Sequence, residues 1–375
     1  MRKRRKPLRF WIFLFLFIGI LGWGVIQITD MVRGIFGKEK VVFHKIHTVS
    51  YQEEEKSFAH PFQTGIAVYD QEKIYFYDEK GQKRWMISKK IDSLIAACAK
   101  DIFFCGDKNT GEITAIDRSG KTLWSAKLDA FLVKLKSNEG GYLAVHVQNQ
   151  QNEEKIIVLN PKGKITGEIS LTEGSILDFA VSEDDIIGIS AVSIANNELS
   201  SYILFYSVEG EVLGGSQERE EIISNVFFDS KSNLFSIGTG NVRSIDQKGK
   251  LRWSEGLPGM ARKIAWNPQG WAAMYLSDYK NTILDPKNQN FIWFIDSSGK
   301  EIGRISVEEN LLGLDSRGNH LAAFTERTVY IYEKNGKFVA EKKISNDVQK
   351  VYLLSSNRLA VLFKNKLEIF EWKDR

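Results

Sequence analysis

Short apolar runs separated by polar turns recur along the chain and predict β-hairpins. In the first clear copy, residues 74–77 (IYFY) and 84–87 (RWMI) flank a polar turn at residues 78–81. An Asp at the start of such a turn can accept hydrogen bonds from backbone N–H groups two residues on, and Gly supplies the positive φ that closes a hairpin. The pattern therefore predicts two antiparallel strands joined by a tight turn.

The same turn recurs with a glycine three residues after a polar residue. An apolar or aromatic residue precedes each of these polar residues. The successive glycines are separated by 37 to 50 residues, and a period near 40 residues is the signature of a repeated supersecondary unit. The seven pairs are Asp78 and Gly81, Asp117 and Gly120, Asn160 and Gly163, Ser207 and Gly210, Asp246 and Gly249, Asp296 and Gly299, and Glu333 and Gly336.

Each repeat unit contains two further strand-like runs between successive glycines. Residues 94–98 and 102–105 form one such pair, and residues 226–228 and 234–237 form another. Four short strands in a unit of about 40 residues are typical of a β-propeller blade. A TIM barrel or a doubly wound sheet would need helical segments between its strands. The pattern therefore predicts an all-β protein.

The number of apolar runs predicts an eight-bladed β-propeller, with seven blades as the alternative. Eight second strands and eight third strands can be counted between residues 65–69 and residues 367–370, but the last unit has no fourth strand before Arg375. Residues 41–49 form a strand-like run ahead of the first unit. We expect this run to pair with residues 367–370 and complete the last blade, because an open blade would leave an unpaired edge.

The N-terminal segment differs from the repeats and predicts a membrane anchor. Residues 1–9 contain six Lys or Arg residues, and the seventeen residues 10–26 carry no charge. As a helix this run spans about 26 Å, close to the roughly 30 Å hydrocarbon core of a bilayer. A cleaved signal peptide is the alternative, but the run exceeds the usual length of its apolar region. We expect one N-terminal transmembrane helix at residues 10–28.

The charge distribution gives the expected topology. The basic tail places the N-terminus in the cytoplasm and the propeller outside the plasma membrane, by the positive-inside rule. The net charge is +4 and the tail contributes +6, so the remainder carries −2 and supports no nucleic-acid surface. The expected parts are a basic cytoplasmic tail (1–9), the transmembrane helix (10–28), a juxtamembrane stalk with the closing strand (29–56) and the propeller (57–375).

Three of the turns end in a tryptophan four residues after the glycine, at Trp85, Trp124 and Trp253. This D-x-x-G-x-x-x-W pattern resembles the blade signature of PQQ-like, quinoprotein-type β-propellers. The whole layout is similar to a family of bacterial single-pass membrane proteins that carry such a propeller. The resemblance implies tryptophan docking between blades that is incomplete here, since the other copies have a small residue in place of Trp: Gly167, Gly214, Gly303 and Ala340.

Few residues suggest chemistry. Cys98 and Cys105 flank a predicted hairpin at residues 100–101 and can share one face of it, so they form either a disulfide or two buried thiols. The five histidines are scattered, and no zinc-binding, nucleotide-binding or nucleophile motif occurs. The chain also lacks the adjacent cysteines and the acidic calcium-binding set of the quinoprotein dehydrogenases. We expect no catalytic residue, no cofactor and no metal site.

These observations favour a membrane-anchored, extracytoplasmic propeller that acts as a non-catalytic binding or scaffold module. The expected partners are the lipid bilayer, through residues 10–28, and a protein or cell-envelope ligand, but no nucleic acid. The alternative is an extracytoplasmic enzyme, a hydrolase or a degenerate quinoprotein, with its site at the mouth of the propeller channel. A cluster of polar residues with perturbed acidity at that mouth would favour the enzyme.

Overall fold

The computed structural model describes residues 41–51, 58–195, 198–277 and 290–373. Residues Phe43–Trp372 form one compact unit, which holds the repeats. The expected cytoplasmic tail and transmembrane helix at residues 1–28, and most of the expected stalk, lie outside the described residues. Within the part of the chain that is described, no helix is both long enough and apolar enough to cross a membrane.

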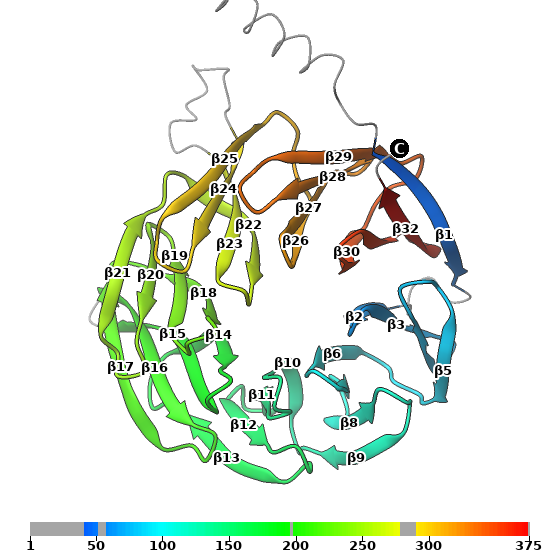
Figure 1. Ribbon diagram of the computed structural model, residues 1–375. Coiled ribbons are helices and arrows are strands. Elements are labelled where there is room, and N and C mark those ends of the chain that lie inside the picture. The colour runs from blue at the N-terminus through cyan, green and yellow to red at the C-terminus, as the bar shows by residue number, and fades with distance from the viewer. Residues whose placement is uncertain (1–40, 52–57, 196–197, 278–289, 374–375) are drawn as a thin grey trace, which may run out of the picture. The chain divides into compact units, whose positions relative to one another are not determined.

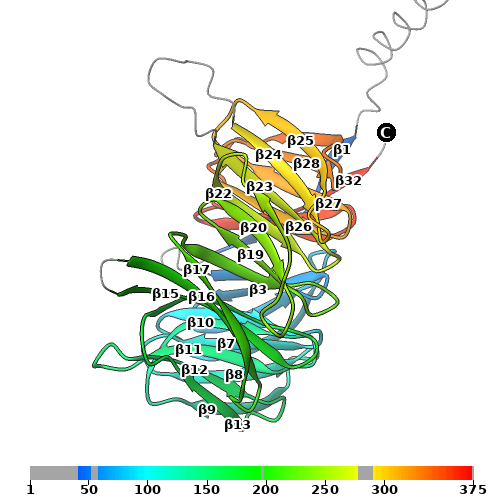
Figure 2. The same cartoon turned by 90° about the vertical axis from the view of Figure 1, so that its left-hand side faces the viewer.

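The strands of this unit form eight four-stranded sheets, which are the blades of a propeller (Figure 1). In each blade the strands follow one another from an inner strand beside the centre of the ring to an outer strand at its rim, and Figure 2 shows the ring from the side. The predicted eight-bladed, all-β propeller is therefore confirmed.

Blades 1 to 7 each consist of four strands that are consecutive in the sequence, and all of their pairings are antiparallel. Blades 1 to 4 contain, from the inner to the outer strand: blade 1, β2 (Phe58–Phe62), β3 (Gly65–Asp70), β4 (Lys73–Tyr77) and β5 (Lys83–Ser88); blade 2, β6 (Leu94–Cys98), β7 (Ile102–Asp107), β8 (Glu112–Asp117) and β9 (Thr122–Lys127); blade 3, β10 (Phe131–Ser137), β11 (Leu143–Gln148), β12 (Glu154–Leu159) and β13 (Ile165–Ser170); blade 4, β14 (Ser175–Val181), β15 (Ile186–Ala195), β16 (Glu198–Ser207) and β17 (Val212–Arg219). Blades 5 to 7 contain: blade 5, β18 (Ile223–Phe228), β19 (Leu234–Gly238), β20 (Asn241–Ile245) and β21 (Leu251–Gly256); blade 6, β22 (Met260–Asn267), β23 (Trp271–Ser277), β24 (Asn290–Asp296) and β25 (Glu301–Val307); blade 7, β26 (Gly313–Arg317), β27 (His320–Phe324), β28 (Thr328–Glu333) and β29 (Phe338–Lys343).

Blade 8 combines strands from both ends of the repeat region. Its strand order is β30 (Lys350–Ser355), β31 (Arg358–Leu362), β32 (Lys366–Lys373) and β1 (Val42–Ser50). The expected pairing of the run near residues 41–49 with the last strand is therefore present, with β1 as the outer strand. Lys45 on β1 and Glu368 on β32 form an ion pair at 3.3 Å although they are 323 residues apart in the sequence.

The hydrophobic core lies between the blades. All residues of the second strands β3 and β19 are buried, whereas the outer strand β17 alternates between exposed and half-buried positions. The reason is that neighbouring blades cover both faces of the second and third strands, so these strands are apolar almost throughout. Burying a Phe side chain stabilises a fold by roughly 1.5–3 kcal/mol, and Phe62, Phe103 and Phe104 are each at most 1% exposed.

Two faces of the ring carry different kinds of connection. The face with the links between blades is called the connection face, and the opposite face, with the hairpins between third and fourth strands, is called the hairpin face. The inner strands begin at the connection face, because each of them follows such a link. The links of the connection face are residues 89–93, 128–130, 171–174, 220–222, 257–259, 308–312 and 344–349.

Candidate functional site

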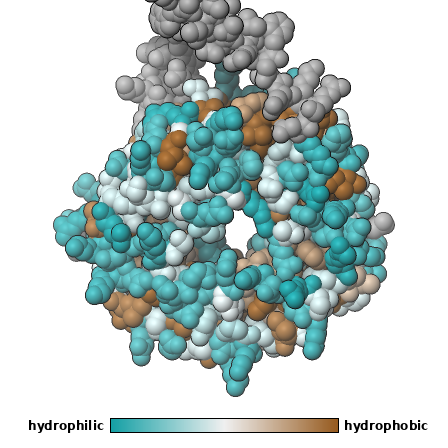
Figure 3. Space-filling model, viewed as in Figure 1, coloured by the Kyte–Doolittle hydropathy of each residue, from teal (hydrophilic) through white to brown (hydrophobic). Residues whose placement is uncertain are grey.

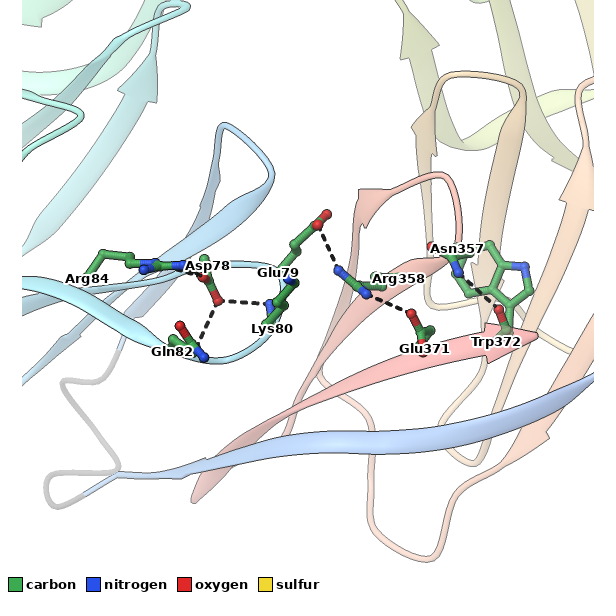
Figure 4. A network of polar contacts seen from close by, with 9 residues as sticks. All are labelled: Asp78, Glu79, Lys80, Gln82, Arg84, Asn357, Arg358, Glu371 and Trp372. Atoms are coloured by element: carbon green, nitrogen blue, oxygen red, sulfur yellow. Dashed lines mark hydrogen bonds and ion pairs between the residues drawn. The ribbon is translucent and has the colours of Figure 1, made fainter.

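The repeated glycines all lie in the hairpin between the third and fourth strands of blades 1 to 7. Their φ angles are between 74° and 89°, so each occupies the left-handed region. In blade 1, Gly81 N donates to Asp78 O at 2.9 Å, and Asp78 Oδ1 accepts from the N–H groups of Lys80 and Gln82, both at 2.9 Å (Figure 4). The side chain thus satisfies the donors of the turn that the strands leave unpaired.

The other turns repeat this arrangement with two variations. Asp117, Asn160, Asp246 and Asp296 each accept two backbone N–H groups in the same way. Ser207 does so with its hydroxyl oxygen, at 3.2 and 3.3 Å. In the turn of Glu333 the acceptor is instead Asn335 Oδ1, which receives Lys337 N at 3.0 Å, while Glu333 pairs with the Lys337 ammonium at 3.1 Å.

Each of the three tryptophans docks its own blade on the next one. Trp85 on β5 donates from Nε1 to Arg118 O at 3.0 Å, and a Cβ added to Gly120 would lie 2.7 Å from its ring. Trp124 donates to Pro161 O and Trp253 to Ser297 O, each at 3.0 Å. At these seams the glycine therefore has two functions, since it permits the positive φ and leaves room for the indole ring.

Where Gly replaces Trp, the next turn itself approaches the strand. A Cβ on Gly167 would lie 2.7 Å from Val208 O, and one on Gly303 would lie 2.2 Å from Asn335 O. At Gly214 the nearest backbone atoms, of Lys248, would be 3.1 Å away. The incomplete docking that the resemblance implied is thus a second form of docking, in which backbone takes the place of the indole.

At the seam between blades 8 and 1 the residue that contacts the turn is His47. It lies on β1, and a Cβ added to Gly81 would be 2.2 Å from the Cβ of His47. Arg358 strengthens this seam by pairing with Glu79 and Glu371, each at 2.7 Å (Figure 4). Sequence reasoning missed both residues, because neither His47 nor Arg358 belongs to the repeated turn motif.

The two cysteines lie on one face of the hairpin of β6 and β7, but diagonally. Cys98 is opposite Phe103 and Cys105 is opposite Ala96. Diagonal Cα atoms in a sheet are about 7–8 Å apart, which is beyond the usual span of a disulfide. Both are free thiols in the structure, and burial raises the pKa of Cys105 to about 12.

The inner strands surround an opening at the centre of the ring, which Figure 3 shows in a space-filling view. In blades 3 to 6 each inner strand contains a β-bulge near its start, on the side of the connection face. A bulge inserts one extra residue and redirects its side chain. The four inserted residues are all exposed: Val133, Leu177, Ser224 and Arg262.

A buried carboxylate joins three inner strands at this part of the channel. Asp178 on β14 forms ion pairs with Lys134 and Lys136 on β10, at 2.7 and 2.9 Å, and accepts Val226 N from β18 at 3.0 Å. Its side chain is 1% exposed. Burial acts to raise the pKa of Asp178, but the two ammonium groups outweigh it, so this pKa lies below its ordinary value.

A second acid lies on the inner strand of blade 7. Asp315 Oδ2 accepts Leu353 N from β30 at 2.7 Å. Arg317, two residues on, donates to Leu353 O at 3.4 Å and also to Gln63 O. Burial raises the pKa of Asp315 to about 6, against the opposing effects of the Leu353 hydrogen bond and the charges of Arg317 and Lys350.

The two channel acids have shifted pKa values, but they do not form one cluster. They lie on blades 4 and 7, and each accepts a backbone N–H from the next inner strand. Among the described residues no group of three or more His, Cys, Asp and Glu side chains could hold a metal ion. The arrangement joins inner strands to one another.

The fold and its docked seams define an eight-bladed β-propeller. The chain belongs to the family of unknown function DUF5711, whose profile matches residues 38–371. A comparison with curated protein sequences found no match.

Solved structures with a similar fold come from several organisms. BamB from Moraxella catarrhalis has a TM-score of 0.59 at 12% identity, covering 88% of this chain and 100% of that chain. Saccharomyces cerevisiae Sqt1 has a TM-score of 0.58 at 11% identity, with 89% and 98% covered. The WD40 domain of SCAP from fission yeast has a TM-score of 0.54 at 12% identity, again with 89% and 98% covered. At such identities the likeness concerns the fold alone.

Proposed function

We propose that the protein is a membrane-anchored binding module that presents its propeller outside the plasma membrane to a protein partner. The observation that carries this proposal is a set of exposed apolar side chains near the start of the inner strands of blades 3, 4 and 6. Apolar side chains such as Phe131 and Met260 are 45% and 47% exposed there, beside cationic ones. Exposed apolar groups on a rigid scaffold are typical of interaction sites, and the fold neighbours include WD40 domains.

The anchor rests on the sequence of residues 1–28, with six cationic residues ahead of an uncharged run. Its test is fractionation of cells that express the full chain with a C-terminal epitope tag. We expect the tagged protein to remain in membranes after an alkaline carbonate wash, and external protease to degrade the propeller in spheroplasts. Recovery in the soluble fraction, or a mature N-terminus after Gly24, would contradict the anchor.

The partner is tested by placing a photo-crosslinking amino acid at Phe131 in the channel and, as a control, at Leu123 on the outer strand β9. Both side chains have similar exposure, at 45% and 46%. We expect a discrete cross-linked protein from Phe131 that Leu123 does not give. Identical products at both positions, or none at Phe131, would count against a channel partner.

The enzyme alternative finds less support in the channel. Asp178 and Asp315 have perturbed acidity, but each is already engaged by the backbone of the next inner strand. A general acid or base needs hydrogen-bond access to its substrate, and these contacts occupy the carboxylates. The binding module therefore accounts better for the geometry.

A further inference from the structure

We propose that β17, the outer strand of blade 4, is an open edge to which an extended segment of a partner protein adds as a further strand. An apolar side chain of that segment would enter a cleft beside β17. This surface lies on the rim of the ring (Figure 1), apart from the inner strands that carry the proposed function, and so goes beyond it. Three features point to it, which are the unpaired backbone of β17, its lack of charge and the neighbouring cleft.

The backbone of β17 bonds to β16 on one side only. Glu220 N donates to Leu199 O at 3.0 Å, and bonded and non-bonded pairs alternate along an antiparallel ladder. Every second residue counting back from Glu220 therefore bonds to β16, whereas Gln217 and Gly215 direct their N–H and C=O groups to the outer edge. Within the described part of the chain, nothing forms a hydrogen bond with these outer groups. A row of such groups is a template for another strand.

β17 lacks the features that protect the other outer strands against further pairing. Its first six residues, VLGGSQ, carry no charge and include no Pro, whereas the other outer strands have at most five uncharged residues in succession. With eight residues it is also longer than the outer strands of blades 1 to 3 and 5 to 7, which have six or seven. Short strands and charged side chains are common ways to block an edge, so β17 is the least protected of these strands.

The next blade covers one face of β17 and leaves its edge accessible. A Cβ added to Gly214 would lie 3.1 Å from the backbone of Lys248, and one added to Gly249 would lie 2.3 Å from Gly215 O. The turn of blade 5 thus packs on the face of β17 that is directed to blade 5. Gly215 and Gln217 are nevertheless both exposed. A further strand would therefore find these positions open.

A cleft of about 570 Å³ lies on the other face, toward blade 3. Tyr202, Leu204 and Tyr206 occupy alternate positions of β16 and line the cleft from one face, together with Val212 of β17. β16 has ten residues, whereas the third and outer strands of blade 3 have six, so blade 3 covers only part of this face. Clefts of this size with apolar and aromatic walls are typical binding sites.

Gly215 connects the edge to the cleft. It is opposite Leu204 in the register, and a Cβ added to Gly215 would lie 3.1 Å from Leu204 Cδ2. The leucine therefore leans over the glycine. A strand paired with β17 would direct every second side chain to this face, and a long apolar side chain beside Gly215 could contact Leu204, since no side chain of β17 intervenes there. In such strand addition the backbone supplies affinity and the cleft selects the side chain.

The charges around the edge and the cleft disfavour a strongly acidic segment. Glu168 is paired with Lys155 at 2.7 Å, and Glu218 with Arg243 at 3.6 Å. Among the other residues of β17, of the cleft and of the adjoining turns and links that are not buried, acids outnumber cations. We therefore expect a neutral or weakly basic segment. The acids are Glu173, Glu209, Glu211, Glu220 and Asp246, and the cations are Arg219, Lys248 and Lys250.

The test is a fluorescence anisotropy titration of the full chain in detergent with labelled synthetic peptides. The probe alternates Thr and Leu and carries methyl groups on alternate backbone nitrogens, so it keeps one pairing edge and cannot stack with itself. The control has the same side chains with a methyl group on every backbone nitrogen, which leaves no pairing edge. We expect the probe to bind at least about tenfold more tightly than the control, a factor that corresponds to about 1.4 kcal/mol. A Thr/Ser probe should bind less tightly than the Thr/Leu probe, because it lacks the apolar side chains.

One position on β17 and a matched position on β9 locate the site. Gln217→Pro removes an outward N–H without breaking a bond to β16 and should weaken binding of the probe at least about tenfold. Gln217→Val keeps that N–H and should change binding by less than about threefold. Ser125→Pro is the control, because Leu128 N donates to Gly111 O and the same alternation directs Ser125 outward. Its binding should equal that of the wild type, and circular dichroism verifies that each variant is folded.

Hydrogen exchange of the unmodified chain gives a readout that needs no variant. The amides of Gly215 and Gln217 point outward and should exchange quickly in the free protein. Saturation with the Thr/Leu probe should slow exchange in residues 213–219 and leave residues 122–127 unchanged, because only the first segment gains hydrogen-bond acceptors. Binding of the probe without slower exchange in residues 213–219 would overturn the proposal.

The remaining outcomes separate the added strand from its alternatives. Equal binding of the fully methylated control, equal losses in Gln217→Pro and Ser125→Pro, or no binding of the probe would each overturn it. A dimer of the full chain that Gln217→Pro abolishes, without binding of the probe, would assign the edge to a second copy. The proposed function is tested separately by cross-linking from Phe131. A cross-linked partner together with no effect at β17 would preserve the binding module and reject the added strand.

Discussion

Two kinds of seam account for six of the eight junctions between blades, and they use residues of opposite size. Between blades 1 and 2, 2 and 3, and 5 and 6, a tryptophan covers the turn of the next blade. Between blades 3 and 4, 4 and 5, and 6 and 7, a glycine lets the backbone of the next turn approach directly. The space between neighbouring blades is filled by the indole ring in one case and by the approaching backbone in the other. A blade without the motif tryptophan therefore still contacts the next blade.

The glycine seams of blades 3, 4 and 5 have an additional connection on the inside of the ring. There Asp178 joins β10, β14 and β18 by two ion pairs and a backbone hydrogen bond. A comparable inner hydrogen bond, which Leu353 N donates to Asp315 Oδ2, joins blades 7 and 8. The tryptophan seams have their side-chain hydrogen bonds at the rim, whereas the seams at Asp178 and Asp315 have polar contacts between inner strands. Substitutions at each place can measure its contribution to the free energy of unfolding.

The largest effect is expected from Trp85→Ala at a tryptophan seam. Trp85 is 9% exposed and donates a hydrogen bond to the next blade, so truncation leaves both a cavity and an unsatisfied carbonyl. We expect a loss of about 3 kcal/mol in the free energy of unfolding, measured by denaturant titration. A loss below about 1 kcal/mol would show that the seam relaxes and that the indole is not the main contact.

A smaller loss is expected from Gly303→Ala at a glycine seam. The new Cβ would lie 2.2 Å from Asn335 O, so strand or turn must shift. Overpacking of this kind costs about 1–3 kcal/mol. Gly256→Ala is the matched control, because a Cβ there meets nothing within 4 Å, and its stability should be nearly that of the wild type. Equal stability of the two variants would contradict close docking at this seam.

The contributions of Asp315 and Asp178 to stability can be distinguished by their pH dependence. The folded-state pKa of Asp315 is raised to about 6 from 3.8, so the folded protein binds its proton more tightly. Its contribution to stability is present below pH 4 and is lost as the pH rises through 6. Asp315→Asn should remove this decline between pH 4 and 6 in thermal unfolding. The pH dependence that Asp178 gives has the opposite sign. Because its pKa is lowered in the folded protein, its contribution to stability is present above pH 4 and is lost in stronger acid.

The smallest effect is expected from His47→Ala at the seam between blades 8 and 1. The imidazole is half-buried and covers one turn, so we expect a loss of about 1 kcal/mol. His47→Trp should retain most of the stability, since tryptophan occupies this position at three other seams. If both variants lose the same amount, measured by thermal unfolding, then His47 does not act as the docking residue of β1.

The periodic features could be predicted from the sequence, and the features that depend on neighbouring blades could not. Asp78 with Gly81 recurs locally, and an unpaired last blade pointed to residues 41–49 as the missing strand. The Asp178 site was missed, because it joins residues 42 to 48 positions apart that no motif links. Gly167 and Gly303 were interpreted as defects in a pattern, since one sequence does not show what approaches a glycine from the next repeat.

The pairing of β1 with β32 also sets an order of events during synthesis. Lys45 leaves the ribosome 323 residues before its partner Glu368, which is on the order of tens of seconds at the usual rates of translation. For that time β1 has an edge without its proper neighbour, and seven blades can form while the eighth waits. Until synthesis reaches β32, β1 of a nascent chain can pair with a strand of another copy. We therefore expect a chaperone to remain bound to β1 on ribosomes stalled just before residue 366, and to be released once β32 has been made.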